Sequence, residues 1–256
     1  MVRITVVGCT GKLGGIIMQN VLKRKDVKND VQLNYAIARQ GNHFVGKNIS
    51  ELVGGNFDLK IIDDLTLAAD SDVYIDCTNT DAFINNNYSK YEKMKKPLVI
   101  ATTGFASDSI EKINRLSTHM PIFMTGNFSI ALHDFIETLK FMAKRISADT
   151  DIQIIEYHHN QKMDAPSGTA LMIKDTLTKT NDRIIPETIN ICSVRGGNIF
   201  GQHEVIFATD KDEVLTFKHQ VASRESFADG AIEAACWIVN QPNGLHNMDD
   251  LCGDIT

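Results

Sequence analysis

The sequence lacks the features that define several large classes of protein. Its five cysteines are scattered, odd in number and form no C-x-x-C pair, which argues against a disulfide framework or a zinc site. No apolar run approaches the roughly 20 residues that a membrane-spanning helix needs. No signal-peptide hydrophobic region follows the N-terminus. We therefore expect a cytoplasmic protein with no membrane partner and no bound metal.

The sequence also lacks an excess of positive charge. Its formal net charge is −6, and a general nucleic-acid-binding protein usually has a basic face. We therefore expect no nucleic-acid partner, and we expect any anion site to be basic only locally. The 256 residues contain 43% hydrophobic and 23% charged residues, which is ordinary for a globular protein. This length suits one large domain or two modest ones.

Three glycines near the N-terminus form a G-x-x-G-x-x-G pattern. Residues 2–7 read as a buried strand, Gly8, Gly11 and Gly14 follow, and a helical pattern comes directly after them. Glycines at this place allow a tight turn and a close approach to a pyrophosphate, and the helix N-terminus offers free N–H donors. Lys12 adds a cation. The pattern predicts a dinucleotide site, and the alternative is a strand-to-helix turn without a ligand.

The end of the second predicted strand bears on the choice of cofactor. This strand covers 31–38, and its tip reads Ala38-Arg39-Gln40. In dinucleotide-binding folds, an acid at this tip binds the ribose 2′-hydroxyl of NADH, whereas a nearby arginine accepts the 2′-phosphate of NADPH. The tip has no carboxylate, so we expect NADPH to be accepted, with Arg39 on the phosphate. The alternative is a solvated loop arginine.

Strands and helices continue to alternate through the first half. This rhythm predicts a Rossmann-type parallel sheet covered by helices, with ligands at the carboxyl ends of the strands. Small polar turns occupy those ends, at 78–79, 102–104 and 126–128. The further predicted strands span 72–78, 97–105 and 120–130, and the predicted helices span 80–95 and 107–119.

The second half has a different order of predicted helices and strands. An amphipathic helix over 129–146 precedes a mixture of strands and one helix, which is typical of an α+β domain. A last helix over 223–241 then returns to the first domain. We expect a dinucleotide-binding domain from 1–127 and 222–256, and a substrate and oligomerisation domain from 128–221. The predicted strands are 151–159, 187–195, 203–209 and 213–221, the last two joined as a hairpin at 210–212, and the helix spans 167–180.

The stretch 156–170, "EYHHNQKMDAPSGTA", carries two adjacent histidines and a lysine. Neighbours on a strand point to opposite faces, so His158 and His159 are poorly placed to bind one metal. Lys162 follows in a short connection that can fold back over the strand end. A partly exposed histidine and a solvated lysine are the alternatives to a functional role.

The same stretch ends in Ser167-Gly168-Thr169, which opens a predicted helix. Ser167 suits the N-cap position, and the first-turn N–H groups of Gly168 and Thr169 then face outward. With histidine and lysine charge nearby, such a helix start can hold a carboxylate. Plain helix capping is the alternative, and the two roles are compatible.

These fifteen residues closely resemble the signature E-x-H-H-x-x-K-x-D-A-P-S-G-T-A of the bacterial dihydrodipicolinate reductases, also called 4-hydroxy-tetrahydrodipicolinate reductases. Five further segments resemble the family in the same order, so the resemblance covers nearly the whole chain. These segments are "VGCTGKLG", "ATTGF", "GNFSIA", "VRGGNIFGQHEVIF" and "SRESFADGAIEAACW".

The resemblance implies a two-domain subunit, a homotetramer formed through the substrate-domain sheet, and NADPH or NADH as cofactor. It implies reduction of 4-hydroxy-tetrahydrodipicolinate, a cyclic 2,6-dicarboxylate, to tetrahydrodipicolinate, with loss of water, in diaminopimelate and lysine biosynthesis. Two other functions stay open from the residues alone: a two-domain reductase with another substrate, and a non-catalytic dinucleotide sensor.

Position by position, the resemblance makes His158 the proton donor and acceptor and Lys162 a second proton donor. It implies that His159, Gly168 and Thr169 bind the substrate carboxylate, and the Ser167 hydroxyl at the same helix start is expected to add a further hydrogen bond. The implied cofactor contacts are Gly8, Cys9, Thr10, Gly11, Lys12, Leu13, Ala101, Thr102, Thr103, Thr125, Gly126, Asn127 and Phe128, with Arg39 added from the strand-tip argument. Two departures stand out: Ala38 replaces the ribose-binding acid of many members, and Ala101 replaces a glycine.

Overall fold

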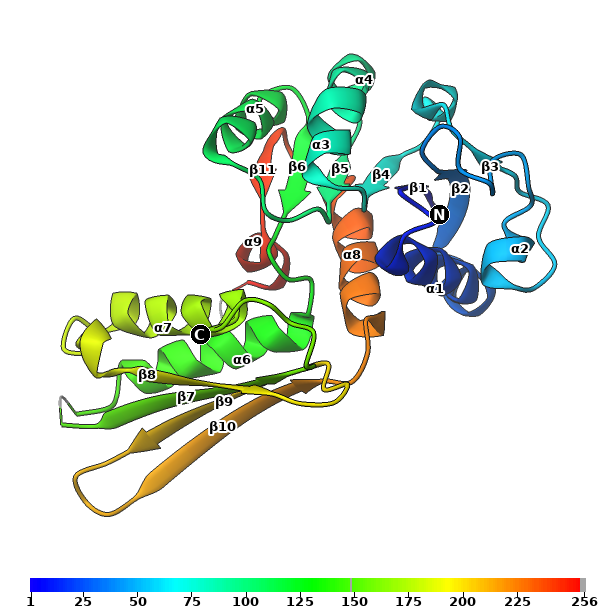
Figure 1. Ribbon diagram of the computed structural model, residues 1–256. Coiled ribbons are helices and arrows are strands. Elements are labelled where there is room, and N and C mark those ends of the chain that lie inside the picture. Colours follow the sequence, from blue (N-terminus) through cyan, green and yellow to red (C-terminus); the bar gives the residue numbers. More distant parts are fainter. Residues whose placement is uncertain (148, 254–256) are drawn as a thin grey trace. The chain divides into compact units, whose positions relative to one another are not determined.

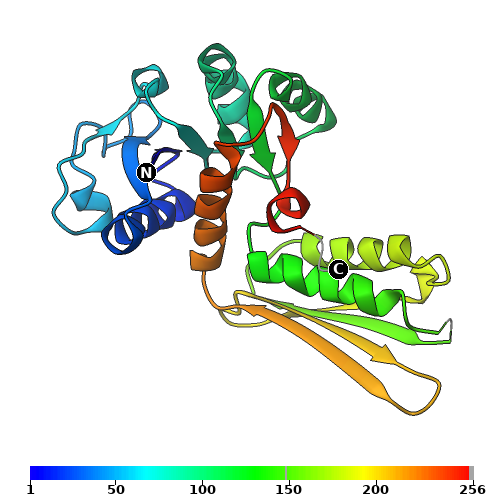
Figure 2. The same cartoon turned by 180° about the vertical axis from the view of Figure 1, so that it is seen from behind.

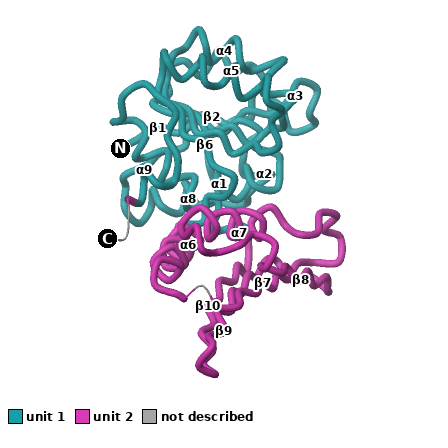
Figure 3. The backbone as a smooth tube through the Cα atoms, turned by 90° about the vertical axis from the view of Figure 1, so that its left-hand side faces the viewer, with its two compact units in different colours: residues 1–129, 224–252 teal, residues 130–223, 253–256 magenta. Residues whose placement is uncertain are grey.

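The computed structural model describes residues 1–147 and 149–253, which divide into two units (Figure 3). The first unit comprises Met1–Ser129 and Arg224–Cys252, two segments that are far apart in the sequence. The second unit comprises Ile130–Ser223 and Gly253. Across the described residues, none of the helices combines the length and apolar character that crossing a membrane requires.

The first unit is built on a parallel sheet of seven strands, in the order β11-β6-β5-β4-β1-β2-β3. The predicted Rossmann-type sheet is therefore confirmed. Its strands are β1 (Val2–Val7), β2 (Val31–Ile37), β3 (Ile61–Ile62), β4 (Val73–Asp76), β5 (Leu98–Ile100), β6 (Pro121–Met124) and β11 (Gly244–His246). The helices are α1 (Lys12–Lys28), α2 (Ser50–Val53), α3 (Thr80–Ala82), α4 (Tyr88–Met94), α5 (Ser107–Ser117), α8 (Glu225–Ile238) and α9 (Met248–Cys252).

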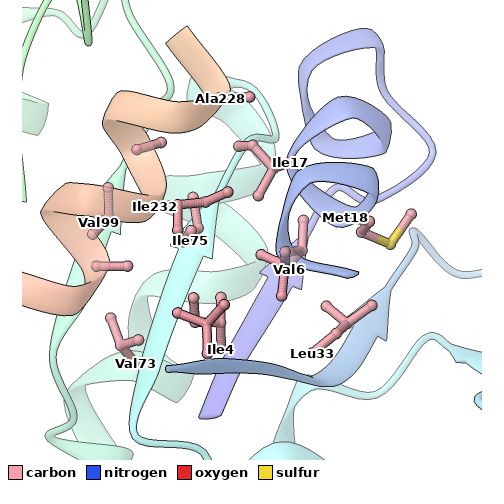
Figure 4. Close-up of a cluster of buried hydrophobic side chains, with 14 of the residues drawn as sticks. Ile4, Val6, Ile17, Met18, Leu33, Val73, Ile75, Val99, Ala228 and Ile232 are labelled. Atoms are coloured by element: carbon pink, nitrogen blue, oxygen red, sulfur yellow. The ribbon is translucent and has the colours of Figure 1, made fainter. Parts of the chain in front are cut away.

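Helices cover both faces of this sheet because alternate strand residues point to opposite faces. Val6 belongs to a core that includes α1 and α8, whereas Val7 belongs to a second core with α4 and α5. Figure 4 shows the first of these cores, in which Ile17 of α1 and Ile232 of α8 lie with Val6 and the other apolar strand side chains. Each fully buried side chain of this size contributes roughly 1.5–3 kcal/mol.

Several boundaries differ from the prediction. The strand expected over 97–105 ends at Ile100, because the chain leaves the sheet after Ala101 donates its N–H to the carbonyl of Asp76. The helix expected over 80–95 forms, but π-helical turns occupy Phe83–Asn87 between α3 and α4. Five short elements were not predicted, because they are too short to show a periodic pattern: β3, β11, α2, α9 and a 3-10 helix at Leu65–Ala68.

The second unit is a four-stranded sheet in the order β10-β9-β7-β8, with β7 parallel to β8 and antiparallel to β9. The predicted hairpin between the last two strands is confirmed. Helices α6 and α7 lie side by side over one face of the sheet (Figures 1 and 2). The elements are β7 (Asp151–His158), β8 (Asn190–Arg195), β9 (Gly201–Ala208), β10 (Val214–Val221), α6 (Ile130–Ala143), α7 (Gly168–Thr180) and a 3-10 helix at Pro186–Thr188.

Strand β7 alternates between the two faces of this sheet. Ile152 and Ile154 are buried in the core with α6 and α7, and Glu156 and His158 follow on the same face. Tyr157 and the other intervening residues lie on the opposite face and are only partly buried. No helix of this unit, as far as the chain is described, covers that opposite face (Figure 1).

Candidate active site

The glycine loop after β1 is tight enough to require two of its glycines. Gly8 has φ of +85°, and a Cβ there would lie 2.9 Å from the carbonyl oxygen of Cys77. A Cβ on Gly14 would lie 2.4 Å from the carbonyl oxygen of Gly8, so only glycine lets α1 pack this closely on the loop. Gly11 is the N-cap of α1 and provides no side-chain cap. The first-turn N–H groups of α1 are therefore left for another acceptor.

The other predicted loop residues surround this helix start. Lys12 is exposed and Leu13 is half-buried, while Thr10 accepts a hydrogen bond from the Asn42 side chain at 3.3 Å. Cys9 is fully buried, and burial raises the pKa of its thiol to about 12. Cys9 therefore packs as a neutral side chain and places the loop, with its backbone rather than its sulfur available to a ligand.

The ends of β5 and β6 also present polar groups. Thr102 is buried, and its Oγ1 has no hydrogen-bond partner in the described part of the chain. Thr103 is exposed beside it. Thr125 and Asn127 close a turn in which the Thr125 hydroxyl donates to the Asn127 carbonyl at 3.0 Å. An orphaned buried hydroxyl is uncommon in folded proteins and marks a place where a ligand can supply the missing partner.

Two further predicted residues complete the end of β6. Gly126 is exposed, whereas Phe128 is buried against α8. A Cβ on Gly230 of α8 would lie 1.8 Å from the carbonyl oxygen of Phe128, so this helix packs directly on the backbone of the turn. The side chain of Phe128 therefore belongs to the core, and the polar backbone before it is the part that a ligand can reach.

A cavity of about 680 Å³ lies beside the glycine loop, at the carboxyl ends of β1 and β2. Gly8 and Arg39, both predicted above as cofactor contacts, line it, and Lys90 adds a second cation. Two carboxylates that no sequence pattern indicated, Asp63 and Asp64, also line it. The cavity therefore offers groups of both charges around the predicted ribose position.

A buried carboxylate at the end of β4 organises one wall of this cavity. Asp76 is fully buried and accepts hydrogen bonds from the Thr78 hydroxyl at 2.5 Å, the Asn87 amide at 3.0 Å and the Tyr91 hydroxyl at 2.8 Å. Burial raises the pKa of Asp76 despite these bonds. Thr78 and Asn87 line the cavity, so Asp76 holds two lining side chains in place although it does not line the cavity itself.

In the second unit, Glu156 is the centre of a buried charged cluster. Its side chain is fully buried on β7 and receives two parallel hydrogen bonds from Arg195, at 2.8 and 3.0 Å. The backbone N–H of Ser167 donates to it at 3.3 Å. Burial alone would raise the pKa of Glu156, but hydrogen bonds led by those of Arg195 outweigh it and hold the pKa at about 2. Glu156 is therefore charged at neutral pH.

His158 shares this cluster. Its Nδ1 is hydrogen-bonded to Oε2 of Glu156, and its ring packs edge-on against His203, with centroids 5.3 Å apart. Burial lowers the pKa of His158, although Glu156 opposes that shift. Burial also lowers the pKa of His203 to about 4, with a further contribution from nearby His158. His203 is therefore neutral at pH 7.

The start of α7 lies against the same cluster. Ser167 is the N-cap, as predicted, and its hydroxyl accepts from the N–H of Ala170. The same hydroxyl lies 3.2 Å from Nε2 of His203. Gly168 is exposed and Thr169 is half-buried in the first turn. The N–H groups of Gly168 and Thr169 in this first turn are therefore hydrogen-bond donors that can face an anion, and the Ser167 hydroxyl lies beside them.

Lys162 folds back as the spacing suggested. Its Nζ donates to the carboxylate of Asp164 at 2.8 Å, and its charge is close enough to lower the pKa of His158. His159, by contrast, is half-buried, and neither of its ring nitrogens has a hydrogen-bond partner among the residues described. The two histidines, equivalent in spacing, therefore have different environments.

Comparison with known proteins identifies the family of this chain. The chain matches the family model described as the N-terminus of dihydrodipicolinate reductase over residues 2–128, and the one described as its C-terminus over residues 131–252. The chain belongs to the dihydrodipicolinate reductase family. The matches include the glycine loop in the first segment and the cluster around Glu156 in the second.

Curated members of the dihydrodipicolinate reductase family match over almost their whole length. The chain is 34% identical to the 4-hydroxy-tetrahydrodipicolinate reductase of Buchnera aphidicola subsp. Schizaphis graminum, covering 98% of this chain and 97% of that protein. It is 36% identical to the reductase of the same name from Caldanaerobacter subterraneus subsp. tengcongensis, covering 98% of each. A solved dipicolinate-bound dihydrodipicolinate reductase from Paenisporosarcina sp. TG-14 has the same fold, with a TM-score of 0.77, 21% identity and 98% of each chain covered.

A dihydrodipicolinate reductase with a Rossmann-type unit uses a nicotinamide cofactor, and the residues of this chain fit one. The free N–H groups at the start of α1 and the absence of a Cβ at Gly8 and Gly14 suit a pyrophosphate. The cluster partners Arg195 and His203 were missed as site residues from the sequence, although both lie within a segment that resembles the family. No sequence motif marked Asp63 or Lys90 as a site residue, because both are far from the glycine loop in the sequence.

Proposed function

We propose that the protein is an NAD(P)H-dependent 4-hydroxy-tetrahydrodipicolinate reductase of diaminopimelate and lysine biosynthesis. The observation that carries the proposal is the position of His158. This histidine is hydrogen-bonded to a charged, buried carboxylate and lies on a strand that ends where the anion-binding start of α7 begins. A reaction that protonates a dicarboxylate needs these two features together: an oriented acid and donors for a carboxylate.

The start of α7 is the proposed site for a substrate carboxylate. Gly168 and Thr169 contribute first-turn N–H groups, His159 and Lys162 contribute side chains, and the helix dipole favours negative charge. A carboxylate of the chain itself supports this assignment. Lys162 is the main group that lowers the pKa of Asp164, and the N–H of Gly168 adds to the effect. An anionic oxygen is therefore already stabilised by the groups proposed to bind the substrate.

Ser167 is proposed to donate its hydroxyl proton to the same carboxylate. Neutral His203 carries one N–H, and its Nδ1 is buried without a partner in the described chain. A buried N–H without an acceptor is rarer than an unused acceptor. We therefore place the proton of His203 on Nε2, from which it donates to Oγ of Ser167 at 3.2 Å. The Ser167 hydroxyl then accepts twice and keeps its own proton for the substrate.

His158 and Lys162 are the proposed proton donors. The substrate first loses its hydroxyl as water and becomes a conjugated cyclic imine. The bound nicotinamide supplies the hydride that reduces the ring at C4. The electron-rich ring is then protonated by His158, and Lys162 stabilises its negative charge or supplies the second proton. A positioned general acid contributes roughly 10²–10⁴-fold to such a step.

The cavity beside Gly8 supports binding of the adenosine end of the cofactor, with NADPH accepted. Arg39 and Lys90 are the two cations that line it, and the negatively charged 2′-phosphate of NADPH can form ion pairs with them. Asp63 opposes this preference. Strand β3 pairs with β2 so that Asp63 follows in register with Ala38, and Asp63 can replace the missing ribose-binding acid. This mixture supports use of both NADPH and NADH.

Cofactor choice is tested by kcat/KM with each cofactor. Arg39→Ala lowers the NADPH/NADH ratio, because it removes a phosphate-binding cation, and Asp63→Asn raises the ratio, because it removes a like charge. Asp58→Asn is the matched control, since Asp58 lies outside the residues that line the cavity. An unchanged ratio in Arg39→Ala removes that residue from the role.

We assign nucleotide binding to the first unit, and substrate binding and subunit contacts to the second. The face of the second sheet that no helix of its unit covers carries partly buried Ile155 and Tyr157 and exposed Val194. A homotetramer that joins subunits through this face removes that apolar surface from water. Light scattering of the purified protein tests for the mass of four subunits. The five cysteines are free, which supports a reducing cytoplasm.

One assay tests the proposed function against its rivals. NADPH oxidation is followed with freshly made product of dihydrodipicolinate synthase as substrate. Wild-type protein is expected to oxidise NADPH, whereas His158→Ala and Lys162→Ala lower kcat by 10²-fold or more, in the range of general-acid loss, while NADPH still binds. Oxidation by neither wild type nor variant favours another reductase or a dinucleotide sensor. Near wild-type turnover in either variant refutes the assignment of that residue.

A further inference from the structure

We propose that Glu156 is a positioning residue that holds the imidazole of His158 with a proton on Nδ1, so that Nε2 is the nitrogen that exchanges protons with a bound molecule. Arg195 is proposed to keep Glu156 charged and in place for this task. The inference rests on the proposed role of His158 in proton transfer, and it names the residues that determine which nitrogen acts.

The geometry leaves one arrangement of protons at this contact. A charged carboxylate accepts hydrogen bonds and donates none. Glu156 is charged, so the Nδ1 of His158 that bonds to it must carry a proton. The second ring nitrogen, Nε2, has no hydrogen-bond partner among the residues described, and the ring retains slight exposure. Neutral His158 is therefore protonated on Nδ1, with the Nε2 lone pair free.

The position of Nε2 is also set by the strand beside it. A Cβ on Gly201 of β9 would lie 3.3 Å from Nε2, a tight contact that glycine avoids. On the other side, Glu156 is held by the two hydrogen bonds of Arg195 and by the N–H of Ser167. The carboxylate is therefore fixed from three directions before it contacts the imidazole. A carboxylate that is itself held in place orients the imidazole bonded to it more strictly than a mobile surface carboxylate does.

The proton balance of the step follows from this arrangement. Imidazolium His158 carries a proton on each nitrogen. When the Nε2–H bond breaks, the proton moves to the electron-rich ring of the substrate and the bonding pair stays on Nε2. The product is neutral imidazole with its proton on Nδ1, and the Glu156 carboxylate stabilises that tautomer. Reprotonation from water at Nε2 completes the cycle, and Glu156 keeps its charge throughout.

Four charged or titratable groups surround His158. Glu156 on β7 favours its protonated form, whereas Lys162 in the following loop and Arg195 on β8 oppose it. His203 on β9 packs against the ring and is neutral at pH 7. Removing the charge of Glu156 leaves Lys162 and Arg195, which oppose protonation, beside neutral His203, so the pKa of His158 should fall further.

Glu156→Gln tests the proposal because it keeps the size of the side chain and removes the charge. We expect kcat to fall by roughly 10- to 100-fold with a much smaller change in KM, because the acid remains but its orientation and protonated fraction are lost. The limb of the pH–rate profile that reports protonated His158 moves to lower pH by about one unit. Glu156→Asp restores part of kcat and of the profile. Glu187→Gln, an exposed change of the same chemistry in the same unit, matches wild type.

A measurement on the wild-type protein covers the case in which Glu156→Gln fails to fold. Nitrogen chemical shifts from ¹⁵N-labelled histidine distinguish protonated from unprotonated ring nitrogens, and His158→Gln assigns the signals by their loss. Protonated Nδ1 and unprotonated Nε2 on neutral His158 support the proposal. A proton on Nε2, or a wild-type pH profile in folded Glu156→Gln, overturns it. If wild type reduces no substrate, the proposed function fails, while the tautomer measurement still decides the inference.

Discussion

Gly14 and Gly15 are neighbours in the first turn of α1, yet an alanine has different consequences at the two positions. At Gly14 the added Cβ would lie 2.4 Å from the carbonyl oxygen of Gly8, whereas at Gly15 the nearest atom, the carbonyl oxygen of Cys9, is 3.8 Å away. Carbon and carbonyl oxygen normally stay about 3.3–3.6 Å apart even in close contacts. Gly14→Ala therefore needs a backbone shift of about 1 Å, and Gly15→Ala needs none.

The two variants are expected to differ in their free energy of unfolding. Both substitutions gain about 1 kcal/mol of helix propensity, so this contribution cancels between them. The remaining difference is the overpacking of Gly14→Ala, which typically costs about 1–3 kcal/mol. We expect Gly15→Ala to be more stable than wild type, and Gly14→Ala to be less stable than Gly15→Ala by this amount. At about 2–4 °C per kcal/mol, the midpoints of the two variants differ by roughly 2–12 °C.

Gly14→Ala and Gly15→Ala should also differ in their affinity for the cofactor. A shift of α1 away from Gly8 moves its N–H groups out of reach of the pyrophosphate, and each hydrogen bond to a charged group contributes about 1.5–3 kcal/mol. Loss of one such bond raises the Kd for NADPH about 10- to 100-fold. Thermal unfolding by circular dichroism and NADPH titration by fluorescence measure both effects. Equal midpoints and equal Kd values for the two variants would refute the reasoning.

Two further predictions concern the second unit. The pKa of Glu156 is about 2 against an ordinary 4.5, so its contribution to stability, about 3 kcal/mol, is present above pH 4.5 and is lost as the pH falls toward 2. The difference in urea unfolding free energy between wild type and Glu156→Gln should therefore shrink steadily as the pH falls from 5 toward 2, and a constant difference contradicts the prediction. Asp164→Ala frees Lys162 from an exposed ion pair worth about 0.5–1 kcal/mol. Titration with dipicolinate, used as a dicarboxylate probe of the carboxylate site proposed at the start of α7, should give a Kd about 2- to 5-fold lower than that of wild type. A higher Kd would mean that Asp164 positions Lys162 for its ligand.

Local patterns in the sequence were sufficient for the elements whose causes are local. The strand at residues 2–7 and the glycine loop depend on neighbours in the chain, and so does the Ser167 cap. The final hairpin also depends on residues that are close in sequence, and the structure contains it. The end of β5 at Ile100 was not predictable from local patterns, because a strand ends where its partners stop offering hydrogen bonds, and those partners are distant in sequence.

The candidate residues of 156–170 could be named from the sequence and from its resemblance to a family, but their connections could not. Glu156 and Arg195 are 39 residues apart, and they meet only because β7 and β8 pair in parallel with His158 opposite Arg195. The antiparallel pairing of β7 with β9 places Glu156 opposite His203 in the same way. Strand register is set by the packing of whole faces, and no local spacing encodes it.

In the first unit too, some features depend on local sequence and others on contacts between distant segments. Glycine spacing and the strand-to-helix pattern determined that a dinucleotide-type loop exists, because steric freedom at Gly8 and Gly14 is a property of those residues themselves. That Asp63 follows in register with Ala38, and that Lys90 lines the same cavity as Arg39, was decided by the pairing of β3 and the placing of α4. The sequence by itself determined which groups are available. The tertiary structure decided which of them meet, because burial and strand pairing act between residues that are far apart in the chain.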